Sequence, residues 1–95
     1  MQERVVITGL GTVNPSGNNV KEFWENLQVG KNSIKNISLF DTNDFKVKIA
    51  GECSIKLDDY FNSKELNKLD RFTAFSLIAA DEAIKDSNLK NNFNA

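Results

Sequence analysis

Histidine is absent from this 95-residue sequence, and cysteine and proline each occur once, as Cys53 and Pro15. Without histidine, the chain lacks the usual general base near neutral pH and the commonest metal ligand. A single cysteine excludes an internal disulfide and provides no thiolate cluster for a structural metal ion. No phosphate-binding loop is present either. We therefore expect no catalytic residue, no metal site and no cofactor site within residues 1–95.

Positive and negative charges are nearly balanced, because the chain has 12 basic and 13 acidic side chains and a net charge of -1. With no basic block, neither nucleic acid nor an anionic membrane surface is the expected partner. Long hydrophobic runs are lacking too, since Val5 to Leu10 is too short for a membrane span or a signal peptide. These absences favour a soluble protein of a reducing compartment.

Hydrophobic residues nevertheless make up 40% of the chain, which argues against disorder. Ninety-five residues are enough for one small domain or for part of one. Segments with the period of strands are interspersed with segments of helical period, and no repeat or low-complexity linker divides them. The sequence therefore predicts a single, incomplete α/β piece.

The longest periodic run, Leu69 to Asn88, predicts one amphipathic helix. Asn88 stands where a left-handed residue ends a helix. Phe75 and Ile78 fall among the charged residues, so a second surface should cover part of the polar side. Small residues at the centre of the apolar face should let another backbone come close; that face comprises Phe72, Thr73, Ser76, Leu77, Ala79, Ala80, Ala83, Ile84 and Ser87.

The first apolar segment, Arg4 to Leu10, has the nearly continuous hydrophobic character of a strand covered on both faces. Gly9 and Gly11 follow in the spacing of a dinucleotide-binding loop. That motif would need a third glycine at Asn14, and a helix should open there instead of Pro15. We therefore expect the two glycines to allow a tight turn or a close approach of the backbone to another segment.

A second, shorter helix is predicted by the capping pattern Asn19-x-x-Glu22, with Gly30 at its end. Phe23 and Trp24 lie at helical spacing with other apolar residues. Aromatic residues in such a pattern are usually packing residues rather than a ligand platform. We therefore expect both rings to lie in the core.

A half-exposed strand is predicted at Lys46 to Cys53, where apolar and polar residues alternate. Cys53 falls on its apolar face with no histidine to activate it, so an inert thiol is expected. The preceding run Asp41 to Asp44 lacks the spacing of a calcium loop and is predicted to be a solvated turn.

A single helical turn is predicted after Ser63, which can act as its N-cap. Lys64 and Lys68 are then four residues apart and share one side of that turn. From spacing alone, the favoured interpretation is that the two lysines face solvent without a specific role, because exposed charges usually contribute little to stability.

The order of these segments resembles the start of the beta-ketoacyl-acyl-carrier-protein synthases, the synthase II group of fatty-acid synthesis and its related ketosynthase domains. Two positions depart from the family pattern: Cys53, where an aliphatic residue is usual, and Asn88, where glycine is usual. The matching residues are Arg4 to Val13, Pro15, Gly17, Asn18, Phe23, Trp24, Gly30, Phe40, Asp41, Phe45, Ala50, Gly51, Glu52, Lys64, Glu65, Leu69 to Phe72, Ala79, Ala80, Ala83, Asp86 and Ser87.

This resemblance implies the thiolase-like fold, layered α-β-α-β-α and built from two similar halves in a homodimer. Residues 1–95 would be an N-terminal portion of its N-terminal domain, and the active-site cysteine and two histidines would lie beyond residue 95. The implied enzyme is an acyltransferase that transfers an acyl chain from acyl carrier protein to that cysteine. Decarboxylation of malonyl-acyl carrier protein then gives the carbanion that attacks the acyl thioester.

The resemblance also implies a role for Lys64 and Lys68, because basic residues at this place in the family help to dock the acidic carrier protein. Two alternatives stay open. The chain could be a non-catalytic module that binds a carrier protein or a ketosynthase, or it could be the start of a polyketide ketosynthase.

Overall fold

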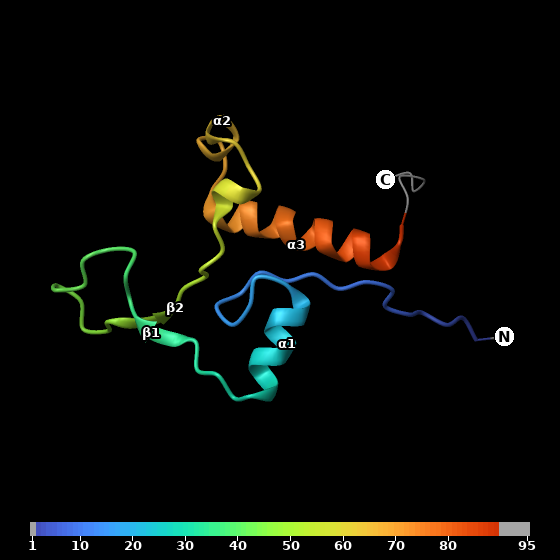
Figure 1. Ribbon diagram of the computed structural model, residues 1–95, viewed down its shortest axis with the longest axis horizontal. Helices are drawn as coiled ribbons and strands as arrows, with labels where there is room; N and C mark the ends of the chain where they lie inside the picture. The colour runs from blue at the N-terminus through green and yellow to red at the C-terminus, as the bar shows by residue number, and fades with distance from the viewer. Residues whose placement is uncertain (1, 90–95) are drawn as a thin grey trace.

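The computed structural model describes residues 2–89 of the chain (Figure 1). Among these residues, no helix has the length and apolar character needed to cross a membrane. The elements, in chain order, are helix α1 (Val20–Gln28), strands β1 (Ile34–Asn36) and β2 (Ile49–Gly51), the short 3₁₀ helix η1 (Leu57–Asp59), and helices α2 (Ser63–Leu66) and α3 (Arg71–Ser87).

Helix α3 confirms the predicted long helix, with Asp70 as its N-cap residue. Its C-terminal residue Asn88 adopts the left-handed conformation, with φ of 59°. On its exposed side, Lys85 Nζ lies 2.7 Å from Asp81 Oδ2, as the spacing of four residues predicts. The sequence pattern therefore predicted each end of this helix to within two residues of its observed position.

The small residues of α3 receive the N-terminal segment, which runs alongside the helix in Figure 1. A Cβ atom at Gly11 would overlap the carbonyl oxygen of Ala79, and one at Gly9 would overlap that of Ala83. Only a residue without a side chain can approach a helix backbone so closely. The expectations that a backbone packs on this face and that the glycines permit the approach are both confirmed.

Two carboxylates of α3 fix this contact by accepting backbone hydrogen bonds. Asp86 Oδ2 accepts from the N–H of Leu10 at 3.0 Å. The two oxygens of Glu82 accept from the N–H groups of Thr12 and Val20, each at 3.0 Å. Because Val20 is the first residue of α1, the Glu82 side chain joins three segments of the chain.

The predicted strand at Arg4 to Leu10 is wrong for the chain as described, because this segment forms no strand in the structure. Strand geometry is stabilised by neighbouring strands, and no segment within residues 2–89 pairs with it. Its apolar side chains are consequently bare, with Val5 95% and Ile7 82% exposed.

Strands β1 and β2 form an antiparallel pair in which Ile34 lies opposite Gly51 and Asn36 lies opposite Ile49. Strand β1 was not anticipated, and β2 covers only three of the residues in the predicted strand at 46–53. Because β1 is also three residues long, there is no partner for a longer β2. The loop between them, which includes the predicted turn at 41–44, projects from the rest of the chain in Figure 1.

Glu52 secures the base of this projecting hairpin. Its carboxylate accepts hydrogen bonds from the backbone N–H of Ser38 at 3.0 Å, from the Ser38 hydroxyl at 2.8 Å and from the N–H of Leu39 at 3.1 Å. The Ser38 backbone and hydroxyl bonds favour the ionised form and lower the pKa of Glu52 below its usual value of 4.5.

Replacing Glu52 with glutamine in the full-length protein should open this hairpin base, because the amide NH₂ group would face backbone donors. Since the folded pKa is lowered, the contribution of Glu52 is present above its unfolded pKa and is lost as pH falls through the folded value. Hydrogen exchange of residues 34–54, corrected for intrinsic pH effects, should be faster in the variant at pH 7. The wild-type segment should lose its protection on acidification.

The matched control is Glu25→Gln, a change of the same type at an exposed position of α1. It should leave exchange in residues 34–54 as in the wild type. Equal protection of that segment in the Glu52 variant and in the wild type would show that the carboxylate does not hold the hairpin.

Few side chains are buried within residues 2–89. Ile55 and Ala74, with 6% and 0% exposure, are the buried apolar residues, and eighteen large hydrophobic side chains are exposed. The surface area of 8162 Å² exceeds the roughly 5,500 Å² of a folded monomer of this length. The radius of gyration is 17.0 Å, compared with about 12 Å for a compact chain.

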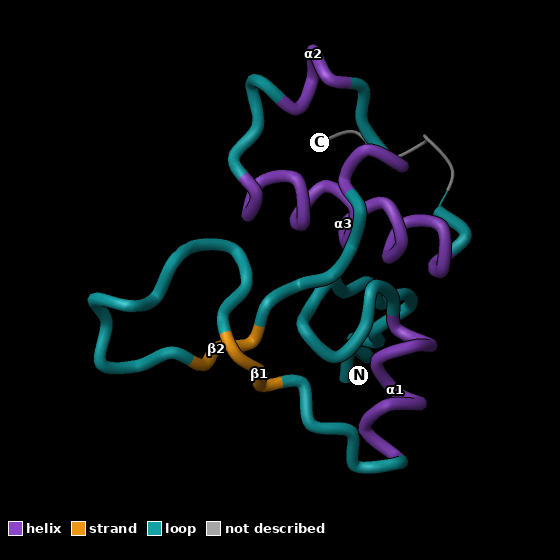
Figure 2. The backbone as a smooth tube through the Cα atoms, turned by 60° about the vertical axis from the view of Figure 1, so that its left-hand side comes forward, coloured by secondary structure: helices purple, strands orange, loops and turns teal. Residues whose placement is uncertain are grey.

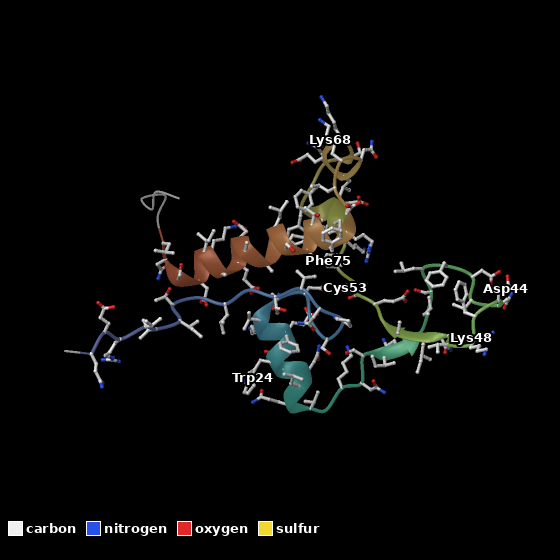
Figure 3. The ribbon with its side chains drawn as sticks, turned by 180° about the vertical axis from the view of Figure 1, so that it is seen from behind. Trp24, Asp44, Lys48, Cys53, Lys68 and Phe75 are labelled. Carbon is white, nitrogen blue, oxygen red and sulfur yellow. The ribbon has the colours of Figure 1, made fainter. Side chains whose placement is uncertain are left out.

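Helix α1 confirms the predicted second helix, since the side chain of Asn19 accepts a hydrogen bond from the N–H of Glu22 at 2.8 Å. The expected burial of its aromatic residues is wrong for Trp24, which is 59% exposed and projects outward in Figure 3, whereas Phe23 is half-buried. Residues 2–89 therefore leave more than half of the Trp24 surface open to solvent.

Candidate functional site

Within residues 2–89, no three or more Asp, Glu or Cys side chains converge as a metal site would require. Cys53 is half-buried, and this desolvation raises the pKa of its thiol despite the opposing charge of Arg71. A raised pKa keeps the thiol protonated and weakly nucleophilic. The structure thus agrees with the interpretation of Cys53 as an inert residue.

A hollow of about 630 Å³ lies between α3 and the start of α1. Its carboxylates are already engaged, because Glu82 and Asp86 accept backbone hydrogen bonds and Asp81 pairs with Lys85. The groups that line it therefore hold the fold together and provide no catalytic pair.

Helix α2 lies in the segment that rises above α3 in Figures 1 and 2, and it presents Lys64. Its N-cap is Asn62, so the predicted cap at Ser63 is wrong by one residue. Asn62 Oδ1 accepts from the N–H of Glu65 at 2.8 Å, and Glu65 Oε1 accepts from the N–H of Asn62 at 3.2 Å. This reciprocal pair, called the Asn62–Glu65 capping box below, fixes the start of the helix.

Lys68 does not belong to α2, because the helix ends at Leu66. Its backbone N–H instead donates to the carbonyl of Glu65 at 3.0 Å in a turn. The prediction that both lysines lie on one helical turn is therefore correct for Lys64 and wrong for Lys68. Lys64 and Lys68 are both exposed, and Figure 3 shows Lys68 at the far end of this projection.

Neither lysine is neutralised within the described part of the chain. Among residues 2–89, the Asp81–Lys85 pair is the one place where an ammonium and a carboxylate lie within 4 Å. The nearby Arg71 is engaged otherwise, since its guanidinium lies 5.0 Å from the Phe75 ring centre and 3.4 Å from the Cys53 carbonyl oxygen. Lys64 and Lys68 thus form an exposed cationic pair at the tip of a projection.

Phe75 and Ile78 confirm the expected second covering surface on α3. Both are half-buried, and a concavity shared with Tyr60 and Phe61 includes Ile78. The segment that leads into α2 therefore packs near the polar side of α3. This packing connects the projection that carries Lys64 and Lys68 to the long helix.

The sequence of residues 2–94 matches the family model described as the beta-ketoacyl synthase N-terminal domain. The chain therefore belongs to the beta-ketoacyl synthase family. This membership confirms the resemblance and the mixed α/β class of the fold, and the family domain has the thiolase-like fold.

Particular relatives include 3-oxoacyl-[acyl-carrier-protein] synthase 2 of Staphylococcus aureus strain COL, which is 44% identical over 93 residues, or 97% of this chain. The granaticin polyketide putative beta-ketoacyl synthase 1 of Streptomyces violaceoruber is 39% identical over 90 residues, or 94% of this chain. The chain spans only 22% of the length of the first relative and 21% of the second.

Proposed function

We propose that this chain forms the N-terminal portion of a condensing enzyme that elongates acyl chains bound to acyl carrier protein. The observation that supports this most directly is the match of nearly the whole chain to the beta-ketoacyl synthase family, with 44% identity to a 3-oxoacyl-[acyl-carrier-protein] synthase 2. The complete enzyme would be a homodimer of layered α-β-α-β-α subunits in the cytoplasm or in an organellar matrix or stroma.

The proposed reaction is a decarboxylative Claisen condensation without a cofactor. An active-site cysteine beyond residue 95 takes the acyl group from the carrier's thiol. Malonyl-acyl carrier protein then loses CO₂, and its carbanion forms a carbon–carbon bond to the acyl carbonyl as the cysteine thiolate leaves. Residues 1–95 provide none of these reacting groups, so the chain by itself should be inactive.

The contribution of this chain to function is docking of the carrier protein through Lys64 and Lys68. Two exposed ammonium groups, one on α2 and one on the turn that follows it, with no carboxylate of residues 2–89 within 4 Å, suit an acidic partner. Each exposed ion pair should be worth roughly 0.2–1 kcal/mol. Such pairs act mainly on association and its salt dependence rather than on the chemical step.

The test is the double replacement Lys64→Glu/Lys68→Glu in the full-length enzyme. Apparent KM for acyl-acyl carrier protein should rise several-fold or more, because two attractive contacts become repulsive. Turnover of a small acyl thioester that needs no docking should stay near the wild-type value. The rise in KM should shrink at high ionic strength.

The matched control is Lys46→Glu/Lys48→Glu, which makes the same change of charge on the exposed hairpin. It should leave KM for the carrier protein nearly unchanged. If the Lys64/Lys68 variant loses activity equally with both substrates, the lysines act through folding. If it loses activity with neither substrate, the lysines are solvated surface residues without a docking role.

A polyketide ketosynthase is the second candidate, and the 39% identity to the granaticin synthase favours considering it. A non-catalytic binding module is the third. Reading the coding sequence beyond Ala95 separates enzyme from module, because an enzyme requires a downstream cysteine motif and two histidine motifs. Product analysis with purified carrier proteins then separates fatty-acid from polyketide synthesis.

A further inference from the structure

Glu65 occupies a position that could weaken the cationic pair. It follows Lys64 directly and precedes Lys68 by three residues, a spacing at which side chains on a helical turn can meet. A Glu65–Lys68 ion pair would cancel half of the positive charge offered to a partner. In the structure this pair does not form, because Glu65 Oε1 accepts a hydrogen bond from the N–H of Asn62 instead.

We propose that the Asn62–Glu65 capping box positions the Glu65 carboxylate away from Lys68 and so keeps both lysines available to an acidic partner. This inference rests on the proposed docking function and adds a specificity-determining device to it. Asn62 acts through Glu65 and does not itself need to touch the partner.

Relative strengths favour the capping box over the competing ion pair. The Glu65 carboxylate accepts a charge-assisted hydrogen bond from the N–H of Asn62, a kind of bond roughly twice as strong as one between neutral groups. An exposed Glu–Lys pair at this spacing typically changes the helix equilibrium by only about twofold. The box also makes two hydrogen bonds at once, from Glu65 N–H to Asn62 and from Asn62 N–H to Glu65. The carboxylate should therefore stay with Asn62 in the free protein.

The end of α2 adds a geometric reason. The helix stops at Leu66, and Lys68 lies in the turn that follows rather than on the next helical turn. In that turn no carboxylate oxygen of Glu65 lies within 4 Å of Lys68 Nζ, so the two side chains make no ion pair. The short helix and its box thus act together.

The decisive experiment compares Asn62→Ala, Glu65→Gln and the double variant in the full-length enzyme. Asn62→Ala removes the side-chain acceptor of the Glu65 N–H and leaves only the backbone N–H of residue 62 to hold the carboxylate, so the box is weakened and the carboxylate can turn toward Lys68. Apparent KM for acyl-acyl carrier protein should then rise roughly two- to fivefold at low salt, the range of an exposed ion pair. Glu65→Gln keeps a side chain that can complete the box without the charge, so KM should equal or fall below the wild-type value.

The double variant distinguishes released charge from lost structure. If the released carboxylate causes the rise, Asn62→Ala/Glu65→Gln should return KM to the wild-type value or below. If KM stays as high as in Asn62→Ala, the cap acts only by shaping the helix and the proposal is overturned. Asn67→Ala, which removes a similar exposed side chain outside the box, is the control and should leave KM unchanged.

The outcomes also separate this inference from the docking function. A rise in KM for Lys64→Glu/Lys68→Glu together with no rise for Asn62→Ala overturns only the role of the capping box. No rise for either variant overturns docking and the inference together. Turnover of the small thioester should remain near wild type in every variant.

Discussion

Replacing Gly11 with alanine is expected to destabilise the full-length protein by about 3 kcal/mol, at the upper end of overpacking effects. The added methyl group would overlap the Ala79 carbonyl oxygen, and the crowding comes from helix backbone rather than from a flexible side chain. Relief therefore requires the N-terminal segment to move away from α3. That movement would also weaken the hydrogen bonds from Leu10 and Thr12 to the helix carboxylates.

The change should appear as a lower midpoint of thermal or denaturant unfolding and as a lower soluble yield. Gly30→Asn is the matched control. Gly30 has φ of +68° with no atom within 4 Å of an added Cβ, and asparagine tolerates that conformation. The control should unfold close to the wild-type midpoint. A Gly11 variant that unfolds like the wild type would show that the close approach to α3 is not required.

The isolated 95-residue chain is expected not to unfold cooperatively, because it buries too little apolar surface. Two apolar residues are buried among 2–89, whereas Val5 and Ile7 are almost fully exposed. Fixing the backbone costs about 1–2 kcal/mol per residue, which so small a core cannot offset. The exposed hydrophobic surface should instead promote association.

Amide NMR spectra and calorimetry of the purified monomeric chain check this expectation. We expect poorly dispersed signals and no heat-absorption peak, while the full-length protein should show a clear unfolding transition. Sharp, dispersed amide signals together with a cooperative melt of the isolated monomer would contradict it.

The parts of the fold that the sequence predicted depend on local signals. The capping pattern at Asn19 and the left-handed Asn88 mark helix ends through contacts only a few residues long. The small residues of α3 also predicted a close backbone neighbour correctly, because the absence of side-chain bulk is visible in the sequence.

Other features could not be predicted because they depend on partners distant in the chain. The segment at Arg4 to Leu10 has strand composition but no strand neighbour within residues 2–89. Strand β1 exists only because β2 pairs with it. Glu82 lies outside the predicted apolar face of α3, yet it accepts hydrogen bonds from Val20 and Thr12, which are 62 and 70 positions away in the chain.

The candidate site was predictable in its residues but not in its geometry. Lys64 and Lys68 could be identified from the family resemblance, and their docking role stays a prediction. The capping box was missed because Asn62 and Ser63 are both favourable N-cap residues, and the sequence does not decide between neighbours of equal propensity. The role of Glu65 depends on that choice.

The hydrogen bond between Leu10 and Asp86 also has a consequence for synthesis on the ribosome. These residues are 76 positions apart. At about 5–20 residues per second, roughly 4 to 15 s pass between the synthesis of the first and that of the second. Throughout that interval the apolar segment that precedes Leu10 lacks the helix that later receives Gly9 and Gly11. A nascent chain in this state is a natural client for a ribosome-associated chaperone, and slower translation of α3 would lengthen its exposure.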